Sequence, residues 1–157
     1  MNPVRQIAAL HTMTGIAMPT ALSVVVALTV SVTSPCVSDA TPPIYTTAVL
    51  LSKQTVSGHD YIITEITIMP TGSTGWHTHI GRTYGIVKAG VLTHYRSDCV
   101  KDGIYAAGDA IADPTGAEHV HLGRNLGTIP VVLDVTYVVP EGAPTSDSAP
   151  DIGCGFA

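Results

Sequence analysis

The sequence predicts an all-β domain behind an apolar N-terminal segment. Short runs rich in Val, Ile, Thr and Tyr recur from residue 41 onward, with Gly and Pro between them. No stretch of about ten or more residues in this part has the apolar periodicity of a helix. Short strands separated by turn residues are typical of a double-sheet sandwich or barrel, not of parallel βαβ units.

Five segments carry the strand pattern most clearly. Each is rich in β-branched or aromatic residues and is bounded by turn residues. The predicted strands are Val49–Leu51, Tyr61–Met69, Thr83–Lys88, Val91–Arg96 and Ile129–Val139. Residues 41–139 are therefore expected to form one β-domain, and the Pro- and Gly-rich residues 140–157 an irregular C-terminal tail.

Length and charge limit the classes of function. A chain of 157 residues is long enough for one domain. Only 12% of the residues are charged, the net charge is −5, and the sequence has no basic block. Nucleic acid is therefore not expected as a partner, since binding a phosphate backbone requires clustered positive charge. A small molecule is the expected ligand.

The first 40 residues have the layout of a secretory signal peptide. Arg5 supplies a basic start, residues 21–32 an apolar core, and Ser38-Asp39-Ala40 a small-x-small cleavage site after Ala40. The alternative is an uncleaved anchor helix, because about 20 apolar residues can span a bilayer. The sequence thus predicts a secreted or periplasmic protein, associated with a membrane only if this segment is retained.

Two cysteines remain after residue 40. Cys99 and Cys154 form an even pair in a chain expected to enter an oxidising compartment. A disulfide between them would tether the tail to the β-domain. Two free thiols are the alternative.

Four histidines form two His-x-His pairs, His77-Thr78-His79 and His119-Val120-His121. Residues i and i+2 of a strand point to the same face, so each pair would place two imidazoles side by side. If both pairs face the barrel interior, their nitrogens can converge on a metal ion. Separately hydrogen-bonded or solvated histidines are the alternative for either pair alone.

Glycines and a proline flank these pairs at regular offsets. Residues 72–90 contain Gly72, His77, His79 and Gly90, and residues 108–125 contain Gly108, Pro114, Gly116 and His119. The two segments resemble the first and second motifs of the cupin superfamily, in the expected order. The resemblance implies a single-domain cupin, a double-stranded β-helix or jelly-roll barrel, similar to small secreted bacterial cupins. It also implies that a homodimer could form.

The resemblance assigns metal ligands by position. It places His77 and His79 at the first two ligand positions and His119 at the ligand position of the second motif. Thr83 stands where cupins usually carry a ligating glutamate. Three neutral ligands would leave the ion's charge uncompensated and favour an anionic substrate. A divalent ion of Fe, Zn, Ni, Cu or Mn is the expected cofactor, with Mn the least favoured by nitrogen ligands.

Other residues have open or secondary roles. His121 could be a fourth ligand, a hydrogen-bonding neighbour of the ligands or a solvated side chain. Thr83, Gly85 and His94 are expected to line the pocket, with a surface position as the alternative for His94. Asn125 lies four residues after His121, displaced by two from its usual offset to the motif histidine.

Three functions fit these features. The first is a metal-dependent enzyme, an oxygenase acting on a small anionic or hydroxylated molecule. The second is a non-catalytic extracellular module that binds a metal or small ligand, favoured by Thr83 in place of an acid. The third is a degenerate cupin in which the histidines have only structural roles. The fold alone does not choose among them.

Overall fold

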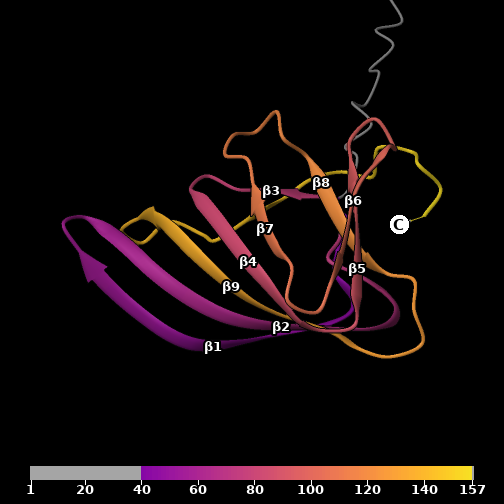
Figure 1. The fold of residues 1–157 in the computed structure, drawn as a ribbon. Helices are drawn as coiled ribbons and strands as arrows, with labels where there is room; N and C mark the ends of the chain where they lie inside the picture. Colours follow the sequence, from indigo (N-terminus) through magenta and orange to yellow (C-terminus); the bar gives the residue numbers. More distant parts are fainter. Residues whose placement is uncertain (1–39, 157) are drawn as a thin grey trace, which may run out of the picture. The chain divides into compact units, whose positions relative to one another are not determined.

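The computed structural model describes residues 40–156, which form an antiparallel sheet bent into a nearly closed barrel (Figure 1). All of the regular structure in these residues is β-strand. The strands are β1 (Ile44–Val56), β2 (His59–Ser73), β3 (His77–Thr78), β4 (Arg82–Ala89), β5 (Val91–Arg96), β6 (Lys101–Ala106), β7 (Ala110–Asp113), β8 (His121–Asn125), β9 (Val131–Pro140) and β10 (Asp147–Ser148). Within this part of the chain, no helix is long and apolar enough to cross a membrane.

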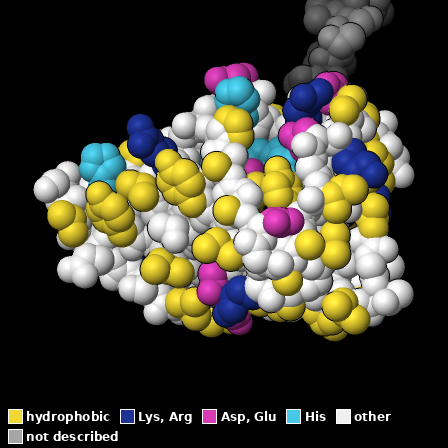
Figure 2. Space-filling model, viewed as in Figure 1, with side chains coloured by type: hydrophobic (Ala, Val, Ile, Leu, Met, Phe, Trp, Pro, Cys, Tyr) yellow, Lys and Arg dark blue, Asp and Glu magenta, His cyan; other side chains and the backbone are white. Residues whose placement is uncertain are grey.

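The long strands form one side of the barrel. β2 pairs with both β1 and β9, β9 pairs with β4, and β4 pairs with β7 (Figure 1). On the other side, β8 pairs with β3 and β5, and β5 pairs with β6. β1 pairs only with β2 among the described strands, and nearly all of its residues are exposed. Figure 2 shows hydrophobic side chains spread over the side of the β-domain that faces the viewer.

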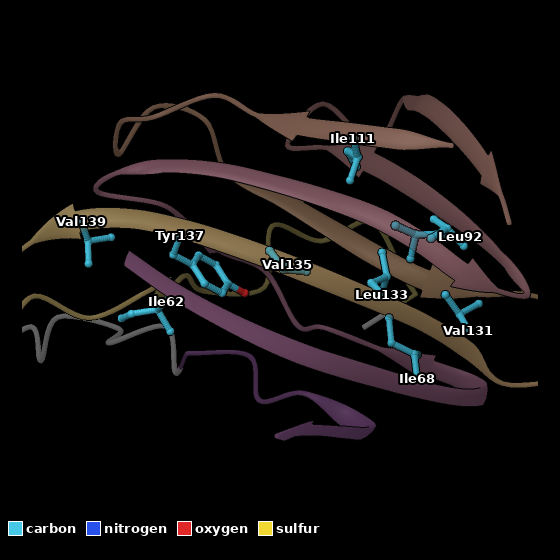
Figure 3. Packing of buried hydrophobic residues seen from close by; sticks show 10 residues of the cluster. Ile62, Ile68, Leu92, Ile111, Val131, Leu133, Val135, Tyr137 and Val139 are labelled. Carbon is cyan, nitrogen blue, oxygen red and sulfur yellow. The ribbon is translucent and has the colours of Figure 1, made fainter. Parts of the chain in front are cut away.

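The core lies between the two sides and follows from strand alternation. Every second residue of β9 is buried, from Val131 to Val139. The residues between them are half-buried, as expected where one face of a sheet is covered. Figure 3 shows these side chains pointing toward Ile62 and Ile68 of β2 and Leu92 of β5. This packing fixes the inward face of β4 and β9, and with it the side chains that line the pocket.

A second, smaller cluster forms behind β3 and β8. Trp76 and Leu122 are fully buried, and the tail residue Phe156 packs against them. The ring centroid of Phe156 lies 6.0 Å from that of Trp76 and 4.6 Å from that of Tyr95. The predicted disulfide between Cys99 and Cys154 is present, with the two Cα atoms 5.5 Å apart. It ties the tail to the β5–β6 turn.

The two ends of the chain flank the β-domain predicted from the sequence. Of the predicted signal peptide or anchor, residues 1–40, all but Ala40 lie outside the described residues. The tail is mostly irregular, as expected, but it also contributes β10, which pairs with β3. Asp147 lies opposite Thr78 and Ser148 opposite His77, so the tail covers the edge of the strand that carries the first histidine pair.

Candidate metal centre

Three histidines, on or directly after two neighbouring strands, come together inside the barrel. His77 of β3 lies directly opposite His121 of β8, and their ring centroids are 4.3 Å apart. His79 follows β3, with its ring 5.0 Å from each of the other two. One nitrogen from each of the three rings lies within 4.8 Å of the others. Figure 2 shows histidine atoms in the upper middle of this face, some of them sunk below the surrounding side chains.

Each ring is held through its Nδ1 atom. Nδ1 of His77 lies 2.9 Å from the carbonyl oxygen of Gly75, a turn residue with φ of +71°. Nδ1 of His79 lies 2.8 Å from the Thr145 carbonyl in the tail, and that of His121 lies 2.9 Å from the His119 carbonyl. A carbonyl oxygen only accepts, so Nδ1 carries the proton in all three rings. Each Nε2 therefore keeps a free lone pair, the arrangement typical of metal-binding histidines.

Burial keeps these histidines neutral. Burial and, to a lesser extent, the neighbouring His121 together lower the pKa of His77 to about 3. Burial likewise lowers the pKa of His121 to about 4 and shifts that of His79 downward. Neutral imidazole is the form that binds a metal ion, and here it is the form present near neutral pH.

A fourth histidine faces the same space. His94 of β5 is 6% exposed, and its ring centroid lies 5.0 Å from that of His121. Its Nδ1 donates to a carboxylate oxygen of Asp102, 2.6 Å away. This bond turns Nε2 toward the interior, where it has no hydrogen-bond partner. His94 thus lines the pocket and does not lie on the surface, the alternative that the sequence had left open.

A buried carboxylate completes the polar group. Asp113 is the last residue of β7, and its side chain is 13% exposed. Its oxygens lie 3.4 Å from Nε2 of His94, 3.7 Å from that of His79 and 3.8 Å from that of His121. Burial raises the pKa of Asp113 above its ordinary value. His94, Asp113 and His121 form a second set whose ligand atoms lie within 4.8 Å of one another.

These polar groups line a cavity with apolar walls. The space between these groups and the walls, including the part open to solvent, measures about 440 Å³. Tyr137 is 6% exposed and lies beside His79, and burial raises the pKa of its hydroxyl to about 12. The remaining wall residues are mainly apolar: Ile66, Leu92, Ile111, Leu133 and Val135.

The structure corrects the sequence assignment of the second-motif ligand. His119 does not join the group: its side chain is 45% exposed and lies 3.4 Å from Glu118. It belongs to a turn before β8, where its backbone N–H donates to Gly116. Strand alternation does not apply in a turn, so His119 and His121 do not share a face. His121 is 4% exposed and occupies the interior position.

The other expected pocket residues divide between two places. Thr83 is 2% exposed and lines the cavity, and its hydroxyl has no hydrogen-bond partner. Gly85 is buried but outside the cavity lining, because the side chain of Ile111 fills the space beside it. Among the lining residues that sequence reasoning missed, Asp113 and Tyr137 carry titratable groups. Asn125 was a usable signal for His121, because it follows that residue at the offset the cupin motif expects.

The barrel and its inward-facing histidines define a class of protein: the chain has the cupin fold. Solved structures with this fold include a double-stranded β-helix protein from Klebsiella pneumoniae, 21% identical, with a TM-score of 0.53 over 69% of this chain and 84% of that one. A cupin-2 domain from Rhodospirillum rubrum is 12% identical, with a TM-score of 0.55 over 70% and 69%. A cupin 2 barrel protein from Salinispora arenicola is 16% identical, with a TM-score of 0.50 over 63% and 80%. No family model and no curated protein matches the sequence.

The residues of the site fit a divalent transition-metal ion. Nε2 atoms of His94 and His121 and an oxygen of Asp113 are buried and lack hydrogen-bond partners. Leaving such atoms unpaired is costly, about 1–3 kcal/mol each, and an ion would satisfy them together. Nitrogen donors of neutral histidine suit Fe, Ni, Cu and Zn.

Proposed function

We propose that the protein binds one divalent transition-metal ion through Nε2 of His77, His79 and His121. The observation that carries this proposal is the matched anchoring of the three rings. Each Nδ1 donates to a backbone carbonyl, at 2.8–2.9 Å, which leaves each Nε2 free to bind. The site is preorganised, because binding requires no change of tautomer or of protonation.

We propose further that the centre serves a metal-dependent enzyme of the oxygenase class. A bound ion would supply a Lewis acid, an anchor for an anionic group and, if it is iron, redox chemistry. The aliphatic walls formed by Ile111, Leu133 and Val135 would exclude water from the substrate. The Tyr137 hydroxyl, neutral near pH 7, would donate a hydrogen bond to it. These groups support a small anionic or hydroxylated substrate.

Metal analysis and oxygen consumption test this function. We expect the protein purified with its disulfide intact to contain close to one transition-metal ion per chain. The double variant His77→Ala/His121→Ala should contain none. Iron-loaded protein should consume oxygen with some members of a panel of small carboxylic and hydroxylated acids, and the double variant should not. Metal binding without turnover for any reconstituted metal would reject the enzyme and leave the binding function.

The second candidate is a non-catalytic metal- or ligand-binding module. It is favoured by the number of donors around the space, because four histidines and Asp113 together could fill the coordination shell of one ion. Catalytic metal sites keep an open position, whereas purely structural sites are closed.

Access of a small anion to the metal separates the two candidates. In the cobalt-substituted protein, an enzyme with an open position should bind azide, and its visible spectrum should change. A closed binding site should keep its spectrum at azide concentrations that saturate open cobalt centres. The His77→Ala variant, which lacks one donor, is the matched control, and it should gain the azide response if the parent site is closed.

The proposed function includes export of the chain from the cytoplasm. The Cys99–Cys154 disulfide is weakly consistent with an extracellular or periplasmic location, where disulfides persist. We propose that the chain is exported and cleaved after Ala40. Cell fractionation followed by N-terminal sequencing should find a product that begins at Thr41. A full-length product in the membrane fraction would indicate the retained anchor instead.

A further inference from the structure

The carboxylate that cupins carry on β4 is missing here, and a carboxylate on the neighbouring strand faces the same space. Thr83 occupies the β4 position, and in the β4–β7 ladder it lies directly opposite Asp113. Side chains of directly opposed residues stand beside each other on the same face, with Cβ atoms about 4.5–5.5 Å apart. Both residues line the cavity. A carboxylate therefore faces the cavity from the strand beside the one that carries Thr83.

The distances around Asp113 are close to those between two ligands of one metal ion. Its oxygens lie 3.4, 3.7 and 3.8 Å from Nε2 of His94, His79 and His121. These distances are too long for good hydrogen bonds. Two ligands of a tetrahedral zinc ion, each about 2.0–2.2 Å from the metal, lie roughly 3.3–3.6 Å apart. The spacing is therefore close to an edge of a coordination polyhedron.

Among the described residues, Asp113 forms no ion pair with a lysine or arginine. Oδ1 of Asp113 has no hydrogen-bond partner. The other nearby carboxylates are already used or point elsewhere. Asp102 accepts from Nδ1 of His94, and the side chain of Glu118 is 73% exposed.

We propose that Asp113 supplies the anionic ligand of the metal centre, from β7 instead of from the β4 position held by Thr83. This inference rests on the proposed metal site of His77, His79 and His121. It gives the centre one negative charge and reduces the net charge of the bound ion from two to one. It also brings Nε2 of His94, which faces Asp113, to the edge of the coordination sphere, where it can bind the ion or its ligand.

Metal affinities of matched variants test this proposal. Asp113→Asn keeps the shape of the side chain and removes its charge. Changes to groups that only support metal ligands cost about 10- to 100-fold in affinity, so loss of a ligand should weaken Zn²⁺ and Co²⁺ binding by at least about tenfold. Asp134→Asn removes the same charge from the exposed side of β9, and it should bind both ions as the parent protein does. Dissociation constants are measured by competition with a chelator.

A double variant tests whether a carboxylate on β4 can replace that of Asp113 on β7. The double variant Thr83→Glu/Asp113→Asn restores a carboxylate at the opposed position. We expect it to recover most of the lost affinity, because the new side chain enters the same space. The visible spectrum of bound Co²⁺ should change in Asp113→Asn, since a ligand is replaced, and should move back toward the parent spectrum in the double variant. A purely structural role of Asp113 would give neither recovery.

The outcomes separate this inference from the function on which it rests. If His77→Ala/His121→Ala loses the metal while Asp113→Asn binds it as tightly as the parent, Asp113 is not a ligand and the three-histidine site stands. If the parent protein binds no transition metal, both proposals fail.

A measurement on the parent protein covers the case in which Asp113→Asn does not fold. Protein labelled with carbon-13 in the side-chain carboxyl of aspartate is compared by infrared spectroscopy with and without Zn²⁺. A ligating aspartate gives a label-sensitive carboxylate band in the difference spectrum. Absence of such a band in zinc-loaded protein would overturn the proposal.

Discussion

Individual buried histidines make the stability of the metal-free protein depend on pH. In the unfolded chain a histidine has its ordinary pKa of 6.5, whereas the folded values are about 4 for His121 and about 3 for His77. Between these values the unfolded chain binds more protons than the folded one. The free energy of unfolding therefore falls as pH is lowered through this range. The raised pKa of Asp113 acts in the opposite direction, because the folded state then holds the extra proton.

We predict that the metal-free protein loses stability between about pH 7 and pH 4.5. The shift for His121 alone, from 6.5 to about 4, corresponds to a loss of roughly 3 kcal/mol when complete. Urea unfolding in the presence of a chelator measures the effect. The variant His121→Phe removes one titrating group and should show a shallower pH dependence. Equal stability at both pH values would contradict the assigned burial.

At the same scale, the sequence predicted which residue types form the site but not all of their positions. His77 and His79 lie where the first cupin motif places them. His119 fits the second motif by its distance from Gly116, yet its backbone N–H closes a turn on Gly116 and β8 begins only at His121, so His121 faces inward instead. Spacing alone does not reveal where a turn ends, whereas the offset from His121 to Asn125 does indicate the register.

Asn125 shows how one element is fixed to the next. It ends β8, and its side chain is 1% exposed. Its Nδ2 donates to the carbonyls of Ile68 and Ile129, both at 2.8 Å, and its Oδ1 accepts from the Gly127 N–H at 2.9 Å. These bonds set the turn into β9 and join it to β2.

We predict that Asn125→Ala destabilises the protein without changing metal stoichiometry. The substitution leaves up to three backbone groups without partners, each costing about 1–3 kcal/mol if it stays buried. We therefore expect the free energy of unfolding to fall by roughly 2–5 kcal/mol in urea titrations. Asn125→Asp keeps the acceptor and loses both donors, so it should be intermediate. A change below about 0.5 kcal/mol would show that water satisfies these groups.

The elements themselves were predictable where their pattern was strong. All five predicted segments lie largely within β1, β2, β4, β5 and β9, which have the clearest β-branched or alternating residues. β7 was missed because its sequence, Ala-Ile-Ala-Asp, has only four residues and lies inside the second motif. The position of Asp113 was missed with it. Once β7 is known, alternation puts Asp113 on the inward face with Ile111.

At the scale of the whole domain, the tail is held by one covalent link and a cluster of rings. The Cys99–Cys154 disulfide spans 55 residues of sequence. Phe156 packs on Trp76 and Tyr95, and the guanidinium of Arg124 lies 5.1 Å from its ring centre. The tail also supplies the Thr145 carbonyl that orients His79. Tethering the tail therefore supports the metal centre as well as the fold.

We predict that Cys99→Ser/Cys154→Ser lowers the free energy of unfolding by about 4 kcal/mol, from chain-entropy reasoning for a loop of this length. Trp76, the single tryptophan of the chain, is fully buried, so fraying of the tail should shift its fluorescence emission to longer wavelength. Metal affinity should also decrease, because His79 loses its fixed orientation. An unchanged emission maximum together with unchanged stability would show that the ring cluster holds the tail without the disulfide.

The whole barrel was predictable because the two motifs and the strand pattern agree with each other. The residues that line the pocket were harder to predict, because they depend on which strands lie side by side. The pairing of β4 with β7 is one example, since two other strands separate them in the sequence. Tyr137 likewise looked like one of several strand residues in sequence. Its contact with His79 arises because both side chains line the same cavity.

The most direct test of the account compares the two histidines of the second pair. His119→Ala and His121→Ala make the same chemical change two residues apart, one in an exposed turn and one inside the barrel. Calorimetric titration with Zn²⁺ should give one ion per chain for the parent and for His119→Ala, with similar affinity. His121→Ala should lose at least about tenfold in affinity or fail to bind. Loss of binding in His119→Ala with binding retained in His121→Ala would contradict the account and restore the sequence assignment.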